Sequence, residues 1–434
     1  MKPDSFIVGS LGKEMYGWMQ KLFPITRSLT GTGVRETLVY LGKLLSNLTI
    51  HEVPSGTVAF DWTVPDEWTI RDAYIADESG LRVVDFQQHN LHVVGYSEPV
   101  DVWLNRDELE HYLYSLPDQP NAIPYVTSYY QRRWGFCLTH NQRLALPHGR
   151  YHAVVDSDLK PGVLNYADLI IPGESDKEVF LSTYICHPSM ANNELSGPVV
   201  TAALARWLQS LEKRRYTYRI VFIPETIGSI VYLSQNIDHL KRKVIAGFNI
   251  TCIGDDRCYS YLPSRAGDTL SDQVALHVLQ HMDDDFKRYT WIDRGSDERQ
   301  YCAPGVDLPI ATIMRSKYGE YPEYHTSLDN SDVVTHSGLE GGFIALRRAI
   351  EIIEQNCYPK VTVFCEPQLG KRGLYPTLST KKSANHVRAM MNLISYCDGS
   401  RSLLDIANLI KEPLWELQPI CDRLVEHGLL VCEK

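Results

Sequence analysis

The sequence predicts an α/β protein whose mostly parallel, helix-flanked sheet is interrupted by an inserted, mainly β domain and followed by a C-terminal winged-helix domain. Three observations predict this class. Two helical patterns in residues 1–53 join a segment, residues 163–366, in which strand-like apolar runs alternate with helical patterns. Residues 54–162 carry short runs rich in aromatic and β-branched residues. Residues 376–434 carry three helical patterns followed by an apolar strand.

The chain opens with two predicted helices. Met15, Trp18, Met19 and Leu22 recur at the spacing of one helical face. A second helical pattern covers residues 34–45.

The inserted domain is predicted from a change in residue pattern after about residue 54. Short runs such as 58–64 and 91–95 contain many Val, Trp, Tyr and Thr residues, and Pro, Gly, Asp and Asn separate them. One helix is expected near residues 107–115. We therefore expect short strands that form a β-rich domain of their own.

From about residue 163 the sequence alternates between strands and helices. The apolar runs have strand length, and residues 342–355 are predicted as the last helix of this domain. This alternation predicts a mostly parallel sheet covered by helices. The predicted strands are 167–173, 179–184, 219–223, 244–250 and 308–313.

A basic linker that contains Gly and Pro, residues 370–376, precedes the tail. The tail is predicted to form helices over 384–397, 402–410 and 413–427, which resemble a winged helix. The last helix, which in a DNA-binding winged helix would lie in the major groove, is acidic and contains Pro419. It therefore offers little positive charge to bind DNA phosphates. We therefore expect the tail to dock onto the α/β domain or onto a second subunit of a homo-oligomer, and not to bind nucleic acid.

Composition limits the class of protein. A chain of 434 residues with 44% apolar residues suggests two or three domains, and a net charge of −10 argues against a general binder of nucleic acid or anionic membranes. No run approaches the roughly 18 apolar residues of a membrane span, and residues 1–8 lack a signal peptide's apolar stretch. The ten cysteines form no Cys-x-x-Cys pair, which predicts reduced thiols and a cytoplasmic location.

Two histidines lie in polar loops that follow predicted strands. His187 follows the strand 179–184 and precedes a helical pattern, and open α/β sheets place their chemistry at such strand ends. His325 lies in a second polar loop far along the chain. Imidazoles and a carboxylate from separate loops form hydrolytic zinc sites. Cys186, beside His187, is interpreted as a buried core thiol rather than a nucleophile.

Five short motifs occur in an order that resembles the zinc aminopeptidases, a superfamily that also contains glutamate carboxypeptidase and glutaminyl cyclase. More closely, the whole chain looks like aminopeptidase-like proteins that add an inserted β domain and a C-terminal winged helix. The resemblance implies a zinc-dependent hydrolase of an amide or peptide bond. In order, the motifs are His187, Asn193-Glu194-Leu195-Ser196-Gly197, Glu225-Thr226-Ile227-Gly228-Ser229, Gly295-Ser296-Asp297 and His325-Thr326.

The chain departs from the family pattern at several metal-binding positions. Ser189 stands where the family has the Asp of His-x-Asp, and Asn193 stands where it has a bridging Asp. The family's Glu-Glu pair is Glu225 followed by Thr226, and Thr251 replaces a further Asp. Three of the five expected metal ligands are therefore neutral. Because two buried zinc ions need several carboxylates to balance their charge, we expect one zinc per chain.

We predict that His187, Glu194 and His325 hold this ion and leave a position open for water or substrate. Glu194 is chosen because its longer side chain can replace an aspartate one residue earlier, and Asn193 is the alternative through its amide oxygen. Asp329, four residues after His325, is expected to orient that histidine.

Glu225 follows the strand 219–223 and occupies the family's general-base position. A carboxylate there is expected to take a proton from a zinc-bound water and pass it to a leaving amine. The alternative interpretation is an acid at the start of a helix, beside Thr226, where the helix dipole favours negative charge.

Four further residues are candidates for substrate contacts. Asp297 and Arg299 lie in a dense polar run and are candidates for recognising substrate charge, although a solvated loop has the same pattern. Tyr130 and Arg132 lie in an aromatic run of the inserted domain. That run predicts a lid or a substrate wall, and aromatic packing between strands explains it equally well.

The leading functional prediction is a mononuclear zinc hydrolase that acts on a small peptide or aminoacyl-amide substrate. One alternative is a noncatalytic descendant of the fold that binds an aminoacyl or peptide ligand, because metal ligands are missing. A second is a regulator whose winged helix binds DNA while the α/β domain senses a small ligand, and the acidic tail weighs against it.

Overall fold

An eight-stranded sheet forms the centre of the computed structural model, which describes residues 10–374 and 381–433, with 381–384 as backbone only. The four inner strands, β12, β11, β13 and β16, are parallel to one another, and β10 on one side and β14 on the other pair with them antiparallel. The predicted α/β class is confirmed. In order across the sheet, the strands are β1 (Thr49–Pro54), β10 (Val163–Ile171), β12 (Tyr216–Ile223), β11 (Ser175–Tyr184), β13 (Val244–Asn249), β16 (Ile310–Met314), β14 (Ser260–Leu262) and β15 (Lys287–Arg288).

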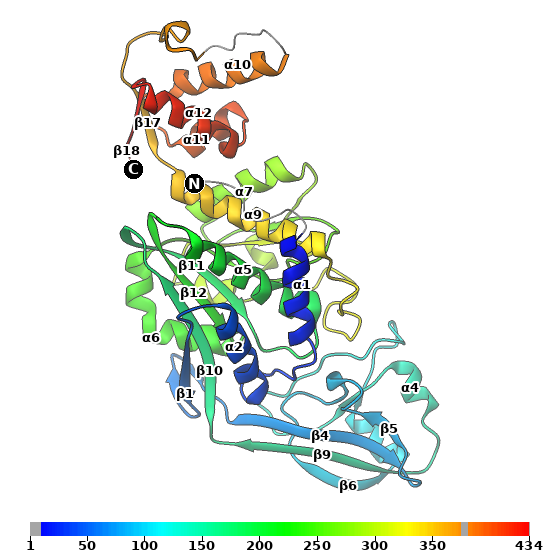
Figure 1. The fold of residues 1–434 in the computed structure, drawn as a ribbon. Helices are drawn as coiled ribbons and strands as arrows, with labels where there is room; N and C mark the ends of the chain where they lie inside the picture. The colour runs from blue at the N-terminus through cyan, green and yellow to red at the C-terminus, as the bar shows by residue number, and fades with distance from the viewer. Residues whose placement is uncertain (1–9, 375–380, 434) are drawn as a thin grey trace. The chain divides into compact units, whose positions relative to one another are not determined.

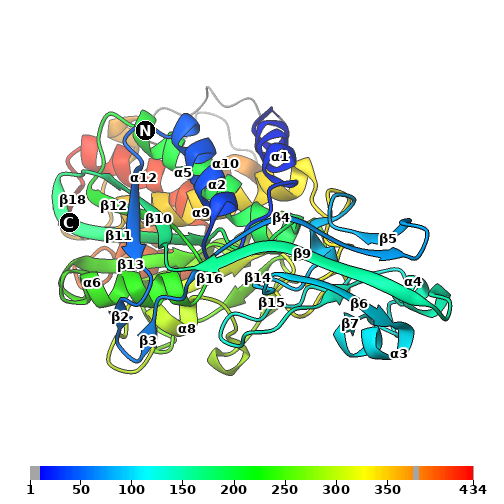
Figure 2. The ribbon, with the colours of Figure 1, turned by 90° about the horizontal axis from the view of Figure 1, so that it is seen from below.

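Helices cover both faces of this sheet, so its inner strands are largely buried. All residues of β11 from Glu178 to Tyr184 are buried, as expected for a parallel strand with helices above and below. Figure 2 shows one helical layer on each side of the sheet. One layer contains α1 (Ser10–Leu22), α2 (Thr32–Leu44) and α5 (Ser196–Ser210), and the other contains α6 (Ile227–Lys243) and α8 (Glu298–Tyr301).

The inserted region forms a four-stranded antiparallel sheet in the order β5-β4-β9-β6. Figure 1 shows its long strands β4 and β9 side by side, and β9 leads directly into β10 of the main sheet. Alternate residues of β9 are buried, which is the period expected when one face packs and the other meets solvent. The strands are β4 (Glu67–Asp77), β5 (Arg82–Asp85), β6 (Val100–Asn105) and β9 (Arg150–Lys160).

Two short strand pairs and two short helices complete this region. The helix expected near 107–115 is shorter than predicted, because α3 (Arg106–Leu109) passes into a single 3-10 turn that ends at Tyr112. The second helix is α4 (His140–Ala145). The pairs are β2 (Val58–Ala59) with β3 (Trp62–Thr63), and β7 (Leu113–Tyr114) with β8 (Phe136–Cys137).

The chain divides into two compact units. The first contains residues up to 271 and 287–343, and the second contains 272–286 and 344–434. This division differs from the boundaries that the sequence suggested, because α7 (Leu270–Met282) and α9 (His336–Gln355) each contribute residues to both units. The proposed start of the tail at residue 376 and the N-terminal residues 1–8 lie outside the described residues.

The second unit contains the predicted winged helix. Its helices are α10 (Lys381–Tyr396), α11 (Leu403–Ile410) and α12 (Leu414–Glu426), close to their predicted bounds, and Pro419 lies inside α12 without ending it. The final strand β18 (Leu430–Glu433) pairs with β17 (Tyr358–Val361), which precedes the linker and was not predicted. Across the described residues, no helix is both long and apolar enough to cross a membrane.

The register of the main sheet brings two loops to one edge. Tyr184, the last residue of β11, pairs with Ile223, the last residue of β12. The loops that carry His187 and Glu225 therefore begin level with each other at the carboxyl end of the parallel strands. Gly197 permits this arrangement, since a Cβ there would lie 2.5 Å from both Ile250 O and Thr183 Oγ1.

We predict that Gly197→Ala lowers the free energy of unfolding by about 1–3 kcal/mol, because overpacking forces α5 away from the sheet. Gly17→Ala is the matched control, since nothing lies within 4 Å of its added Cβ and Ala is favoured over Gly in a helix by about 0.5–1 kcal/mol. Thermal denaturation checks both. Equal changes of melting temperature in the two variants would contradict the close packing of α5 at Gly197.

Candidate active site

The site is built around His187, which lies in the loop after β11. Its side chain is almost fully buried at the carboxyl edge of the sheet. A short π-helical turn, Ala191–Leu195, follows and leads into α5. This turn carries Glu194 back against the histidine.

Glu194 contacts His187 through the ring nitrogen Nδ1. Its Oε2 lies 2.7 Å from Nδ1, and the carboxylate has no exposed surface. Burial, and secondly the charge of Arg27, lowers the pKa of His187 to about 3, so the imidazole is neutral near pH 7. With Nδ1 donating to Glu194, the lone pair of Nε2 is available on the opposite side of the ring. Carboxylates commonly orient metal-binding histidines in this way.

A buried arginine, Arg27, lies behind this pair. Its Nε donates to the backbone oxygen of His187 at 2.9 Å and lies 3.5 Å from Oε1 of Glu194, and its Nη1 donates to Leu22 O at 2.7 Å. Burial raises the pKa of Glu194 to about 8, and Arg27 opposes that shift. Arg27 was not predicted from the sequence, because a single arginine between Thr26 and Ser28 belongs to no recognisable motif.

Glu225 faces His187 from the neighbouring strand end. Its Oε2 lies 3.7 Å from Nε2 of His187, and its side chain keeps about 21% of its surface exposed. Thr226 has φ of 66° and ψ of −78°, and Ile227 N donates to Glu225 O at 2.8 Å, which defines a strained γ-turn with positive φ. Such strain in a β-branched residue persists only where the surroundings hold it.

Asp297 and Arg299 hold this turn. Asp297 Oδ1 accepts from Thr226 N at 2.7 Å and from Ser229 Oγ at 2.8 Å, and Arg299 Nη2 donates to Thr226 Oγ1 at 2.6 Å. Burial and then the charge of Asp297 raise the pKa of Glu225 to about 8, and burial raises that of Asp297 to about 7. Both predicted substrate contacts therefore lie beside Glu225, where they support its backbone.

His325 lies across from His187, with 5.5 Å between the ring centres. His325 has a positive φ of 56°, and its ring stacks on that of Tyr324, with 3.9 Å between the ring centres. The ring of Tyr125, from the inserted region, packs edge-on against both histidine rings, with 5.2 Å between ring centres in each case. The backbone N–H of Tyr125 donates to His325 O at 2.9 Å. The inserted region thus supplies a wall of the site, but through Tyr125, which the sequence analysis did not select.

The two residues predicted from the inserted aromatic run lie away from the histidines. Tyr130 is mostly exposed and packs edge-on against Trp62, with ring centres 5.5 Å apart. Arg132 is exposed and forms ion pairs with Asp66 at 3.4 Å and Glu98 at 3.7 Å. Their role in substrate binding stays a prediction.

Two of the positions with neutral residues in place of family ligands, Asn193 and Thr251, lie in one hydrogen-bond network. The hydroxyl of Tyr184 lies 2.7 Å from Asn193 O, 3.1 Å from Asn193 Oδ1 and 2.6 Å from Thr251 Oγ1. All three side chains are buried. A network of uncharged groups therefore occupies the part of the site where a second metal would need carboxylates.

Asp329 has a different partner from the one expected. We predicted that it orients His325. Instead its carboxylate accepts from the backbone N–H groups of Asn192 and Asn193, at 2.7 and 2.9 Å, and from the hydroxyl of Tyr321 at 2.9 Å. Asp329 therefore fixes the turn that carries Glu194.

Comparison with known proteins identifies the family. Residues 16–356 match the family described as a domain of unknown function, DUF4910, and residues 356–432 match a winged helix-turn-helix family. The chain belongs to the DUF4910 family. It is 44% identical over 398 residues, 91% of each chain, to a Clostridium acetobutylicum protein whose name joins polysaccharide biosynthesis to an aminopeptidase-like domain.

Solved structures show that the DUF4910 chain has an aminopeptidase-like fold. A candidate peptidase from Clostridium acetobutylicum is 41% identical with a TM-score of 0.92, covering 98% of this chain and 97% of that one. A zinc aminopeptidase from Bacillus subtilis is 12% identical with a TM-score of 0.56, covering 79% and 94%. A peptidase M28 precursor from Shewanella amazonensis is 10% identical with a TM-score of 0.56, covering 82% and 97%.

One group of side chains near His187 has its possible ligand atoms close enough together to hold a metal ion. Among the described residues of the first unit, Cys186, His187 and Glu194 form the one group of three whose ligand atoms lie within 4.8 Å of one another, and His325 is not in it. On the other side of His187, Nε2 lies 3.7 Å from Oε2 of Glu225. The predicted ligand set stays a prediction.

We predict that Arg27→Met destabilises the protein by about 1–3 kcal/mol at pH 6, because two buried carbonyl groups lose their donor. Glu194, with its pKa raised to about 8, is protonated at pH 6 with or without Arg27. Above pH 8 it ionises in the wild type, where Arg27 pairs with it, but not in the variant. The stability difference should therefore widen by about 1.4 kcal/mol per pH unit above pH 8.

Denaturant unfolding with a chelator present, at pH 6 and pH 9, measures this difference. Arg206→Met is the control, since Arg206 forms an exposed pair with Glu14 at 2.7 Å and such pairs contribute about 0–1 kcal/mol. A difference for Arg27→Met that is the same at both pH values would contradict the pairing with Glu194.

Proposed function

We propose that the protein hydrolyses an amide or peptide bond of a small peptide or aminoacyl-amide substrate, with one zinc ion per chain. One observation carries the proposal. Glu194 occupies Nδ1 of His187, while Nε2 of the same ring faces Glu225 at 3.7 Å. A neutral, oriented imidazole next to a partly exposed carboxyl group is a combination that suits metal-dependent hydrolysis. The aminopeptidase-like fold of the family supports it.

His187, through Nε2, and His325 would hold the ion. When bound, the ion would polarise the substrate carbonyl and lower the pKa of a water molecule. Glu194 was predicted as the third ligand, but its contact with Nδ1 supports a positioning role through His187. Arg27 lies beside Glu194 at the back of the site and pairs with it when the carboxyl group is ionised.

Glu225 is proposed to hold and transfer the proton. Its raised pKa of about 8 lets the carboxyl group take up a proton and release it to a leaving amine near neutral pH. The γ-turn at Thr226, held by Asp297 and Arg299, keeps its backbone in place. Tyr125 covers the two histidines and limits the access of water from the inserted side.

A second candidate is a noncatalytic protein that binds an aminoacyl or peptide ligand. The observation that favours it is Arg27, whose guanidinium gives Glu194 a positive partner without any metal. Metal analysis and a substrate screen separate the two candidates. Because the Clostridium acetobutylicum relative is named for polysaccharide biosynthesis, the screen should contain N-acylated amino sugars beside short peptides and aminoacyl amides.

We predict about one zinc ion per chain in protein purified without added metal, measured by elemental analysis. His187→Ala and His325→Ala should each lose most of it, whereas His51→Ala should keep it, because His51 lies on β1 and pairs with Asp168. The carboxylates for a second ion are absent at Asn193, Thr226 and Thr251. Two tightly held ions per chain would contradict this count.

We predict that Glu225→Gln keeps its zinc and its fold but lowers turnover by about 10²–10⁴-fold, the usual contribution of a positioned acid–base group. Glu14→Gln, in an exposed ion pair on α1, is the control and should leave turnover unchanged. Near-normal activity of Glu225→Gln would remove the assigned proton-transfer role. Loss of zinc from this variant would make Glu225 a ligand instead, and no activity of the wild type on the whole panel would favour the binding protein.

A further inference from the structure

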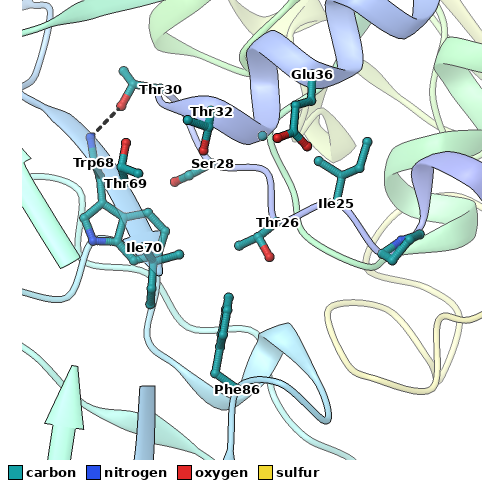
Figure 3. Close-up of a pocket in the computed structure, with 12 residues that line it drawn as sticks. Ile25, Thr26, Ser28, Thr30, Thr32, Glu36, Trp68, Thr69, Ile70 and Phe86 are labelled. Carbon is teal, nitrogen blue, oxygen red and sulfur yellow. Dashed lines mark hydrogen bonds between the residues drawn. The ribbon is translucent and has the colours of Figure 1, made fainter. Parts of the chain in front are cut away.

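A hollow of about 320 Å³ lies on the first unit where residues 24–33, the start of α2 and strand β4 meet. Figure 3 shows the hydroxyl groups of Thr26, Ser28 and Thr32 around it, with the carboxylate of Glu36 on one side and the ring of Phe86 on another. A volume of this size lies at the lower end of the range for small-molecule sites. No role for this hollow follows from the chemistry at His187.

Several polar groups in this hollow have no protein partner. Among the described residues, the side-chain hydroxyls of Thr26, Ser28, Thr32 and Thr69 make no hydrogen bond, although Ser28 is only 4% exposed. Thr30 differs, since its Oγ1 accepts from Trp68 N at 3.0 Å, as Figure 3 shows. Thr32 is exposed and Thr26 and Thr69 are partly exposed, so these hydroxyls are open to solvent and free to exchange bonds to water for bonds to a ligand.

A second hollow of about 270 Å³ continues the first and shares Pro24, Thr26 and Phe86 with it. Gln88 and Asn90, which both carry amide side chains, are among the residues that line it. In the described residues, the buried Oδ1 of Asn90 has no hydrogen-bond donor. We call the two hollows together the hydroxyl groove.

The local sequence explains why the hydroxyl groups gather here. Every second residue from 26 to 32 is Thr or Ser, so that the hydroxyls alternate with Arg27, Leu29 and Gly31. Gly31 has a φ of +96°, and a Cβ at Gly33 would lie 1.9 Å from Thr26 O. These two glycines let the segment fold tightly onto the start of α2 and leave the groove open.

The chemistry of the groove suits a neutral sugar. Hydroxyls and amides both donate and accept hydrogen bonds, a carboxylate such as Glu36 accepts from two neighbouring sugar hydroxyls, and Phe86 and Ile70 offer apolar surface to a ring's C–H face. An anion fits less well. The α2 N-terminus has no side-chain cap, but Glu36 repels negative charge, and no Lys or Arg lines the 320 Å³ hollow.

We propose that the hydroxyl groove is a binding site for a neutral saccharide. A saccharide site in this groove is separate from the proposed hydrolysis and does not depend on that activity. The groove also shares a backbone segment with the active site, since Thr26 and Ser28 line the groove while Arg27 between them contacts His187 and Glu194. A bound saccharide would therefore hold the segment that positions Arg27.

The test is ligand-observed NMR on the full chain with neutral hexoses, N-acetylhexosamines and their disaccharides, with inorganic phosphate in parallel. We expect saturable binding of at least one neutral saccharide. The double variant Thr26→Val and Thr32→Val keeps side-chain shape but removes two hydroxyls, and should weaken binding about tenfold or more. Glu36→Gln should weaken it as well, and Thr63→Val, in the β2–β3 hairpin outside the groove, should not.

The outcomes separate this proposal from the proposed hydrolysis, because binding is measured without turnover. Saccharide binding lost in the groove variants and kept in Thr63→Val supports it, whatever the enzyme assay shows. Binding that all variants retain equally would place the sugar elsewhere and overturn it. Binding of phosphate alone, or of no saccharide in millimolar amounts, would also overturn it. Circular dichroism and thermal denaturation of each variant confirm that the fold is kept.

Discussion

The contact among Arg27, Glu194 and His187 is the constraint on which the rest of the site depends. A carboxylate without exposed surface needs a partner, and Arg27 and Nδ1 of His187 both supply one. Because Nδ1 is used, the ring presents Nε2 to Glu225 and to the space in front of His325. The direction in which His187 can bind a metal is thus set by the contact between its Nδ1 and Glu194.

Three separate parts of the chain hold this arrangement in place. Asp329 accepts hydrogen bonds from the turn that carries Glu194, Asp297 holds the strained turn after Glu225, and Tyr125 of the inserted region packs on both histidines. The two aspartates make bonds to backbone groups rather than to reacting atoms. These two carboxylates therefore stabilise turns. A metal-ligand pattern in the sequence cannot distinguish such a carboxylate from one that binds a metal.

The sequence predicted the strands β11 and β12 and the loops after them, because apolar runs and helix periodicity are local signals. It therefore placed His187 and Glu225 at one sheet edge correctly. Arg27 and Tyr125 were not found, since their contacts to His187 span 160 and 62 residues and no spacing rule connects them. Strand β17 was missed for a similar reason, because its partner β18 follows three helices later.

Anomalous diffraction at the zinc edge, from crystals grown with zinc, tests the central claim most directly. The account predicts a single peak per chain, within ligand distance of Nε2 of His187 and beside His325, with Glu194 still on Nδ1 and Arg27 still paired with it. A second peak near Asn193 and Thr251, or a single peak bound by Glu194 and Cys186 on the Nδ1 side, would contradict the account.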